Sequence, residues 1–280
     1  MVIFINTSKK DFIVFLNIII VVVIFISILN HKLSNDETVI PVSISSDAAI
    51  VMDVKTKEVL FEKSAHSKKL TASICKVLTA YTAIKYLPLD HYIIVNDSMI
   101  NVEGSRIYLE SGDIVSIETL LYGLMLRSGN DAAMALAMAY SDNPTDFIAK
   151  MNEIVYSLNL KDSVFENPSG LDGKTNNYSS CYDLAFITSV ALENENFRKI
   201  FGTKTYDVTL PSGKKMHFFN KHKLVLADNN VIGGKTGYTK RAGRTLITVF
   251  EQNGRELVVV TMDAYNDWNL HRYLVNAYDE

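Results

Sequence analysis

Apolar and polar positions divide the chain, from about residue 45 onward, into strand-like segments at its two ends and helix-like segments between them. The mostly apolar run at 48–54 and the shorter one at 59–62, separated by a polar turn, predict a hairpin. Residues 244–250 and 256–262 are a second pair of strand patterns, and the Asn-Gly between them is the strongest short hairpin signal. The sheet is therefore expected to be antiparallel.

Between these pairs, apolar residues recur at helical spacing in several segments. Helices are predicted at about 71–86, 117–126, 130–140, 143–158 and 179–193, and a last one at 266–278. Strands from both ends with helices in the middle favour an α+β fold, in which an antiparallel sheet carries an inserted helical lobe at approximately 71–200. An active site is then expected in the cleft between sheet and lobe.

An apolar run at 12–29 precedes this region, with only Asn17 and Ser27 polar and with Lys9 and Lys10 before it. A helix of that length spans roughly 27 Å, close to the hydrocarbon thickness of a bilayer. The lysines predict that the N-terminus stays inside and the rest is exported. We therefore expect an N-terminal membrane anchor or signal segment over 1–30.

A polar tether over 31–46 and a folded domain over 47–280 follow from the same pattern. Neither an Ala-x-Ala-like site nor a cysteine follows the apolar run, which favours an uncleaved anchor in the cell membrane with the folded domain outside. A cleaved signal peptide, which would make the protein secreted, is the alternative.

Composition excludes several classes of function. With 28 basic and 31 acidic residues the formal charge is -3, so no positive field for nucleic acid is expected. The six histidines form no metal-binding motif, and neither a metal nor another cofactor is expected. Cys75 and Cys181 lie in helical, apolar surroundings, which favours buried inert thiols over a disulfide. The oligomeric state is left open.

Ser73 and Lys76 are the first candidates for chemistry. They begin an apolar segment that predicts a buried helix, and an i, i+3 pair shares one helix face. Burial disfavours a charged ammonium, so Lys76 would act as a base that takes the proton of the Ser73 hydroxyl. The spacing alone is weak, because Ser212 and Lys215 repeat it in a polar turn.

Two further constellations are ambiguous when taken singly. Ser128 and Asn130 lie at the junction of two predicted helices, where Gly129 could end one helix and Asn130 cap the next. Lys235, Thr236 and Gly237 follow two glycines, which is typical of a glycine-rich turn.

Together the three motifs, Ser-x-x-Lys, Ser-x-Asn and Lys-Thr-Gly, resemble the signature of class A β-lactamases and penicillin-binding proteins. The stretches around them are similar to the serine D-alanyl-D-alanine carboxypeptidases, the low-molecular-mass penicillin-binding proteins of the β-lactamase/transpeptidase-like superfamily. These stretches are Gly123-Leu-Met-Leu-Arg-Ser-Gly-Asn-Asp-Ala-Ala, Phe165-Glu-Asn-Pro-Ser-Gly-Leu-Asp, Tyr178-Ser-Ser-Cys-Tyr-Asp-Leu-Ala and Gly234-Lys-Thr-Gly-Tyr-Thr-Lys. The resemblance runs from about residue 48 to about residue 263.

The resemblance implies an enzyme that removes the terminal D-alanine from peptidoglycan stem peptides through an acyl-enzyme and that binds β-lactams covalently. Ser73 would attack the carbonyl between the two D-alanines with Lys76 as general base. Ser128 would relay a proton to the leaving amine. Asn130 would bind the substrate amide and steady Lys76.

The same resemblance assigns substrate binding to the third motif. Lys235 and Thr236 would engage the substrate carboxylate, and Gly237 would leave room for a peptide along the strand edge. The backbone N–H groups of Ser73 and Tyr238 would form the oxyanion hole.

The sequence departs from the family in three places. Thr71 stands where proline is frequent, which affects helix entry more than chemistry. The sequence stops at Glu280, where many members continue into a β-rich domain and a C-terminal anchor, so the N-terminal helix is expected to take over anchoring. Residues 262–266 stand where some relatives carry an arginine that binds the carboxylate, which puts that contact in doubt.

Two other functions stay open. A class A-like β-lactamase would use Glu166 as a deacylating base, but Gly170 stands where the lactamase loop has asparagine. A non-catalytic penicillin-binding wall sensor would keep the pocket without turnover.

Overall fold

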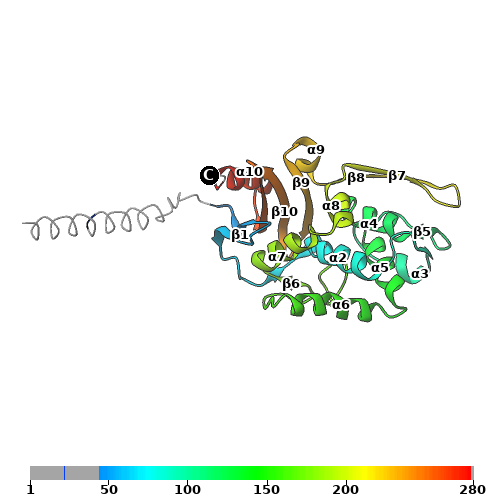
Figure 1. Ribbon diagram of the computed structural model, residues 1–280. Helices are drawn as coiled ribbons and strands as arrows, with labels where there is room; N and C mark the ends of the chain where they lie inside the picture. Colours follow the sequence, from blue (N-terminus) through cyan, green and yellow to red (C-terminus); the bar gives the residue numbers. More distant parts are fainter. Residues whose placement is uncertain (1–21, 23–43, 279–280) are drawn as a thin grey trace, which may run out of the picture. The chain divides into compact units, whose positions relative to one another are not determined.

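Five strands from the two ends of the domain form one antiparallel sheet in the order β2-β1-β11-β10-β9 (Figure 1). The structure is a computed structural model, and it describes Val22 and residues 44–278. The strands are β1 (Ser46–Asp53), β2 (Val59–Lys63), β9 (Val231–Thr239), β10 (Gly243–Gln252) and β11 (Arg255–Ala264). The two predicted hairpins are present, and β1 joins them by pairing with β11. β9 forms one edge of the sheet.

Both faces of the sheet are covered, which explains why its central strands are continuous apolar runs. Ile50 and Met52 belong to a core shared with the helices, whereas their neighbours Ala49 and Val51 face α9 and α10. The helices are α2 (Lys76–Tyr86), α3 (Asp97–Ile100), α4 (Ile117–Leu126), α5 (Asn130–Tyr140), α6 (Pro144–Ser157), α7 (Cys181–Ala191), α8 (Glu195–Gly202), α9 (Lys223–Ala227) and α10 (Asp267–Ala277). The six predicted helices are all present, and the α+β class is confirmed.

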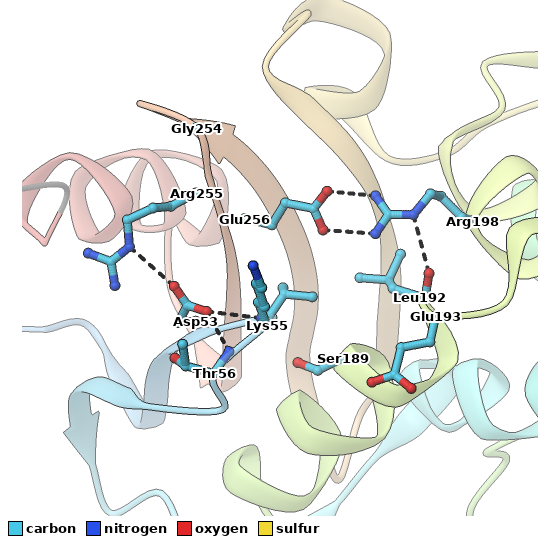
Figure 2. A pocket seen from close by; sticks show the side chains of 11 residues that line it. Asp53, Lys55, Thr56, Ser189, Leu192, Glu193, Arg198, Gly254, Arg255 and Glu256 are labelled. Atoms are coloured by element: carbon cyan, nitrogen blue, oxygen red, sulfur yellow. Dashed lines mark hydrogen bonds and ion pairs between the residues drawn. The ribbon is translucent and has the colours of Figure 1, made fainter.

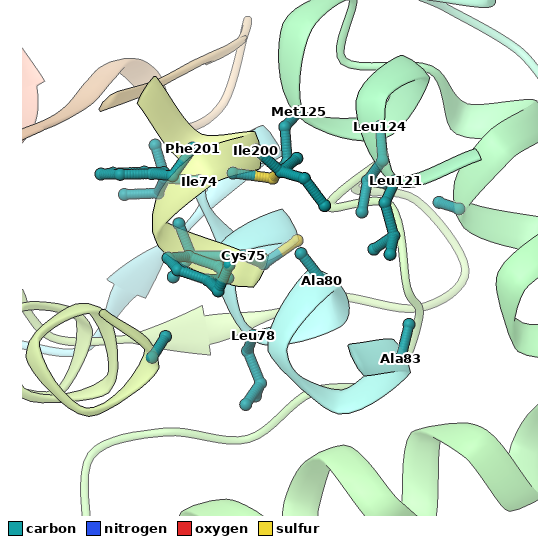
Figure 3. Packing of buried hydrophobic residues seen from close by; sticks show 14 of the residues in the cluster. Ile74, Cys75, Leu78, Ala80, Ala83, Leu121, Leu124, Met125, Ile200 and Phe201 are labelled. Atoms are coloured by element: carbon teal, nitrogen blue, oxygen red, sulfur yellow. The ribbon is translucent and has the colours of Figure 1, made fainter. Parts of the chain in front are cut away.

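Helix α2 is the centre of the helical part. Leu78 and Ala80 are fully buried, and Figure 3 shows them with residues of α4, such as Leu121, and of α8, such as Phe201. Burial of one Leu or Phe side chain contributes about 1.5–3 kcal/mol. The start of α2 is therefore held rigidly where the helices meet β9.

Small elements that the sequence pattern did not predict complete the domain. They are the pairs β3 (Lys69–Leu70) with β6 (Tyr178–Ser179), β4 (Tyr92–Ile94) with β5 (Ile114–Ser116) and β7 (Thr205–Thr209) with β8 (Lys215–Phe219), besides α3, α8 and α9. The edge strand β9 was not predicted from the pattern either. β7 and β8 form a hairpin whose turn holds Ser212, and both Ser212 and Lys215 are exposed. The second Ser-x-x-Lys pair is thus in water, as expected.

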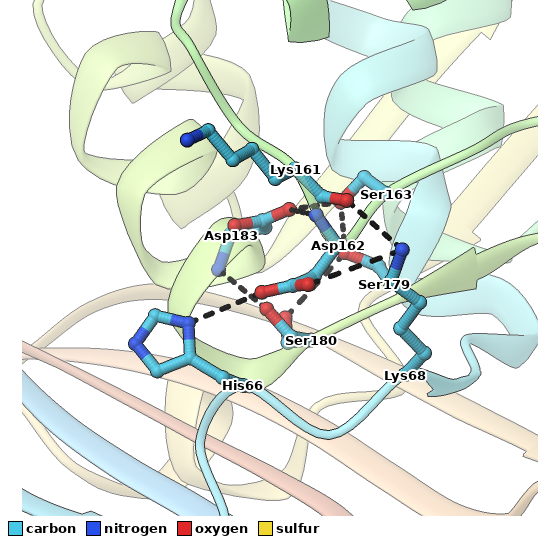
Figure 4. A network of polar contacts seen from close by, with 8 residues as sticks. All are labelled: His66, Lys68, Lys161, Asp162, Ser163, Ser179, Ser180 and Asp183. Carbon is cyan, nitrogen blue, oxygen red and sulfur yellow. Dashed lines mark hydrogen bonds and ion pairs between the residues drawn. The ribbon is translucent and has the colours of Figure 1, made fainter.

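A polar network fastens the segment that follows α6. The carboxylate of Asp183, at the start of α7, accepts hydrogen bonds from the backbone N–H of Asp162 at 3.0 Å and from the Ser163 hydroxyl at 2.7 Å. Asp162 in turn contacts His66 at 3.1 Å (Figure 4). The network holds the beginning of the loop at 165–177, which continues toward Lys76.

The two cysteines are free and buried, as predicted. Burial raises the pKa of the Cys75 and Cys181 thiols, so both stay protonated and inert. The expected anchor over 1–30 and nearly all of the tether over 31–46 lie outside the described residues. Within the part that the structure describes, no helix combines the length and apolarity that a membrane span needs.

Candidate active site

Ser73 and Lys76 lie side by side at the N-terminus of α2. Lys76 Nζ lies 2.9 Å from Ser73 Oγ. Ser73 belongs to a short 3₁₀ turn, η1 (Ala72–Cys75), and Lys76 is the first residue of α2, where an uninterrupted α-helix was predicted. Side chains three residues apart eclipse in a 3₁₀ turn, so this geometry places the amine directly beside the hydroxyl.

Lys76 has the surroundings of a base. Its side chain is fully buried, and burial lowers its pKa to about 8. Nζ also contacts Asn130 Oδ1 at 2.8 Å and the backbone carbonyl of Ser169. A neutral amine has two N–H bonds and one lone pair. When the two N–H groups serve Asn130 and Ser169, the lone pair is directed at Ser73 and can accept its proton.

Asn130 orients this amine and does not cap a helix. It is the first residue of α5, whose N-cap is Gly129, and no side chain makes the cap hydrogen bond. Its amide nitrogen donates to the backbone carbonyl of Glu103 at 2.6 Å, which fixes the oxygen toward Lys76. The capping interpretation of the second motif is therefore wrong.

Ser128 and Lys235 form a second hydroxyl–amine pair. Lys235 Nζ donates to Ser128 Oγ at 3.0 Å and to the backbone carbonyl of Thr236 at 2.9 Å. Lys235 is buried in β9; burial, and then the positive charges of Lys76 and Lys221, lower its pKa. Ser128 has a φ of 62°, an uncommon conformation for a residue other than glycine. This backbone conformation directs the Ser128 hydroxyl toward the cleft.

The third motif is a strand and not a turn. Gly237 lies in the edge strand β9, directly against η1: a Cβ atom there would be 2.8 Å from the backbone nitrogen of Ser73 and 2.4 Å from Thr245 Oγ1. Only glycine fits at this distance. The two N–H groups expected for the oxyanion hole belong to Ser73 and to Tyr238, the residue after Gly237, and this pairing stays a prediction.

A cleft of about 420 Å³ lies between η1, the α4–α5 junction and β9, and Ser73, Ser128 and Gly237 are among the residues that line it. Seven of its residues were missed by the sequence analysis: Ser105, Lys221, Lys223, Arg244, Thr245, Asp267 and Trp268. Arg244 lies opposite Tyr238 in the β10–β9 register, and Asp267 holds its guanidinium at 2.9 and 3.0 Å. Residues 262–266 carry no arginine, but β10 supplies one to the cleft.

Glu166 is not placed as a lactamase base. It is exposed, and its carboxylate accepts the backbone N–H of Asn176 at 2.6 Å. The group from this loop that reaches Lys76 is the Ser169 carbonyl.

Comparison with known proteins settles the family. A family model described as D-alanyl-D-alanine carboxypeptidase matches residues 34–266. The chain belongs to this family. The β-lactamase/transpeptidase-like fold is confirmed with it, since the solved structures below share the arrangement.

Among curated relatives, the chain is 29% identical to the D-alanyl-D-alanine carboxypeptidase DacF of Bacillus subtilis, covering 78% of this chain and 57% of DacF. It is 30% identical to a carboxypeptidase of Streptomyces sp. K15, covering 77% and 80%. The chain thus spans somewhat more than half the length of DacF.

Two solved structures are similar over most of the chain. A D-alanyl-D-alanine carboxypeptidase of Mycobacterium tuberculosis H37Rv has a TM-score of 0.80 at 28% identity and covers 85% of this chain and 94% of its own. The Streptomyces K15 DD-transpeptidase has a TM-score of 0.79 at 27% identity, with 84% and 97% covered.

Proposed function

We propose that this protein is a serine DD-carboxypeptidase that removes the terminal D-alanine from peptidoglycan stem peptides through an acyl-enzyme on Ser73. β-Lactams would acylate the same hydroxyl. The observation that carries the proposal is the 2.9 Å contact between Ser73 and a buried Lys76 whose pKa is lowered to about 8. Membership of the D-alanyl-D-alanine carboxypeptidase family supports the substrate.

In the first step, Lys76 takes the proton of Ser73 while the serine oxygen bonds to the carbonyl carbon between the two D-alanines. The N–H groups of Ser73 and Tyr238 stabilise the negative oxygen that forms; one such donor is typically worth about a hundredfold to a thousandfold in rate. Ser128 then passes its proton to the leaving nitrogen as the C–N bond breaks and takes in its place the proton held by Lys76, which becomes neutral again. Water attacks the ester and gives a proton to Lys76; that proton returns to Ser73 Oγ as the shortened peptide is released.

Lys235 and Thr236 hold the terminal carboxylate. Burial makes the free ammonium of Lys235 costly, and an arriving carboxylate offsets this by pairing with it. Arg244, clamped by Asp267, adds a second cation to the same cleft. The site is therefore selective for peptides with a free C-terminal carboxylate next to the scissile bond.

The protein would work outside the cell membrane, anchored by the apolar segment at 12–29. The lysines before that segment and a cell-wall substrate support this placement. Fractionation of the full chain and of a variant lacking residues 1–30 tests it: the full chain is expected in the membrane pellet and the variant in the soluble fraction. A full chain found in the soluble fraction would contradict the anchor.

Release of free D-alanine from an N-acylated Lys-D-Ala-D-Ala peptide tests the activity. Wild type is expected to release it, Ser73→Ala to release none, and Ser212→Ala, the serine of the exposed Ser-x-x-Lys pair, to match wild type. Release by Ser73→Ala would refute the assignment. Rapid penicillin hydrolysis without D-alanine release would instead indicate a β-lactamase, and a stable penicillin adduct without release would indicate a sensor.

A further inference from the structure

Cavities away from the catalytic cleft differ in how their charges are matched. One of about 640 Å³ lies where β1, β11 and α8 approach, and its arginines face carboxylates (Figure 2). Arg198 pairs with Glu256 through two contacts of 2.8 Å, and Arg255 pairs with Asp53 at 3.2 Å. Its arginines are satisfied from within the fold and leave little attraction for a charged ligand.

A second cavity, of about 390 Å³, lies beside strand β8. All six residues from Lys214 to Phe219 line it, whereas no residue of β7 does. The cavity is therefore on the side of β8 that faces away from β7. Its other lining residues belong to the loop at 106–110 and to the end of α4. We call this cavity the β8 slot.

The β8 slot is fastened at both of its ends. At the hairpin turn, Lys214 Nζ donates to the backbone carbonyl of Tyr108 at 3.1 Å. At the other end, the backbone N–H of Lys221 donates to the Leu126 carbonyl at 3.0 Å. Between these contacts, no hydrogen bond joins β8 to the loop in the part of the chain that the structure describes. The strand and the loop are thus held near each other with their facing sides unpaired.

The register of the β7–β8 hairpin decides which backbone groups of β8 are used. Leu210 donates its backbone N–H to the Lys214 carbonyl at 2.8 Å, and Asn220 donates to the Lys204 carbonyl at 2.9 Å. Both contacts belong to the one register that runs through the hairpin. Because hydrogen-bonded pairs alternate along an antiparallel ladder, the even-numbered residues of β8 are the ones that bond to β7.

The odd-numbered residues of β8 present a free edge to the slot. The backbone N–H and C=O groups of Lys215, His217 and Phe219 point away from β7, and no third strand among the described residues pairs with β8. Figure 1 shows the hairpin as an arm that extends past α4. Unpaired edge groups are a template for another extended chain, because main-chain hydrogen bonds can hold an incoming segment there.

The charge of the β8 slot selects the kind of segment that fits. Arg106, Arg127 and Lys215 line it, and none of the three makes an ion pair with another described residue. The carboxylate that lines it, Glu110, is already paired with Lys214 at 2.9 Å. A chain with a formal charge of -3 thus gathers unmatched positive charge along a free strand edge.

These cations disfavour one occupant and favour another. Two copies of this chain that paired edge to edge through β8 would bring two sets of cations together, and like charges across a strand pair repel. A segment with acidic side chains would instead place carboxylates beside the arginines. Tyr108 and Phe219, 72% and 53% exposed, border the slot and offer apolar contact to the residues between the acidic ones.

We propose that the β8 slot is a docking site at which an extended acidic segment of a partner protein adds to the β7–β8 sheet as a third strand. Its backbone pairs with the free groups of Lys215, His217 and Phe219, and its acidic side chains meet Arg106 and Arg127. The slot and the catalytic cleft share no lining residue, so the inference stands independently of the proposed function.

The test measures binding of synthetic fluorescent peptides to the full chain by fluorescence polarisation. The main probe alternates glutamate with threonine, a residue that favours strands, and is blocked at both termini. A second probe has glutamine in place of glutamate. Two further probes carry N-methyl groups on one or the other alternate set of residues, which removes the backbone donors from one edge of the peptide at a time.

The protein variants separate backbone pairing from charge. His217→Pro removes an N–H that faces the slot and leaves the hydrogen bonds to β7 in place, whereas His217→Ala keeps that N–H. Arg106→Gln with Arg127→Gln removes the two arginines. A matched control, Lys55→Gln with Lys161→Gln, removes two exposed cations elsewhere on the domain. An unchanged melting temperature verifies that each variant is folded.

The wild type is expected to bind the glutamate probe and to bind the glutamine probe more weakly. N-methylation of one alternate set should weaken binding by about tenfold or more and of the other set little. His217→Pro should bind about fivefold more weakly than His217→Ala, as the loss of one hydrogen bond would give. The double arginine variant should lose about five- to tenfold, high salt should remove that loss, and the control should match the wild type.

Three results would overturn the inference. One is equal binding of the glutamate and glutamine probes. Another is equal binding of the two N-methylated probes, which would exclude strand addition without any change to the protein. The third is loss of peptide binding after penicillin has acylated Ser73, because the peptide would then occupy the catalytic cleft.

Discussion

Acylation of Ser73 should be switched on by the loss of a proton from Lys76. Burial lowers the pKa of this amine from 10.5 to about 8. At pH 7 that shift raises the neutral fraction from about 0.03% to about 9%, roughly a 300-fold gain in available base. The rate should therefore rise about tenfold per pH unit below pH 7.5 and level off above about pH 8.5.

The assay is the second-order rate constant for labelling by a fluorescent penicillin between about pH 6 and 9.5, the range that brackets the lowered pKa. Lys76→Arg is the informative control, because a guanidinium keeps the charge but cannot lose its proton. It should lose at least the hundredfold typical of removing a general base at every pH. A rate independent of pH across this range, or a rise centred near 10.5, would refute the role of burial at Lys76.

Three further outcomes are expected. Gly237→Ala should slow penicillin labelling by about tenfold or more, because its Cβ would meet the backbone nitrogen of Ser73 at 2.8 Å; wild-type kinetics would contradict that packing. Asp267→Asn removes the carboxylate that holds the Arg244 guanidinium, so KM for a D-Ala-D-Ala peptide should rise about threefold with little change in kcat. If the Arg244–Asp267 pair had only a structural role, the melting temperature would fall and KM would stay unchanged. His222 is buried and its pKa is lowered from 6.5 to about 3, so the folded state loses stability as pH falls from 6.5 toward 3, by about 1.4 kcal/mol per pH unit. His222→Gln should reduce this pH dependence of the free energy of unfolding, measured with urea at acid and neutral pH. An unchanged dependence would show that other groups cause it.

Four of the five strands of the main sheet and the larger helices could be predicted from local patterns, whereas β9 was interpreted as a glycine-rich turn. The runs that became β1 and β11 are apolar because both faces of the sheet are covered, and α2 is apolar all round because it is the centre of the core. The short elements escaped prediction for the opposite reason. β7 and β8 lie in an arm with alternating burial, and sequence reasoning interpreted only its turn.

The sequence predicted the part of the candidate site that belongs to the three motifs. Lys76 contacts Ser73 and Asn130, and Lys235 contacts Ser128, while the roles that the resemblance implies for these residues stay predictions. The third acceptor around Lys76 is the backbone carbonyl of Ser169, which lies in one of the stretches that carry the resemblance but was given no role there. Its position depends on Gly170, which adopts a left-handed φ of 81° and packs the loop against η1, the turn before α2. A Cβ atom at Gly170 would collide with the backbone of that turn.

Cations from other strands and loops were also beyond local reasoning. Arg244 is the second residue of an ordinary strand, and only the β10–β9 register carries it to the cleft. Lys221 follows the β7–β8 hairpin and reaches the cleft through its hydrogen bond to Ser105. Strand register and loop packing bring such residues to the cleft, and neither can be predicted from the spacing of residues along the sequence.

Intact-mass analysis after exposure to penicillin, followed by peptide mapping, tests the central claim that the buried amine of Lys76 makes Ser73 a nucleophile. Wild type and Ser212→Ala should each gain one penicilloyl group on the peptide that contains residue 73, and Ser73→Ala should gain none. An adduct on another residue, or an adduct of equal yield on Ser73→Ala, would contradict it.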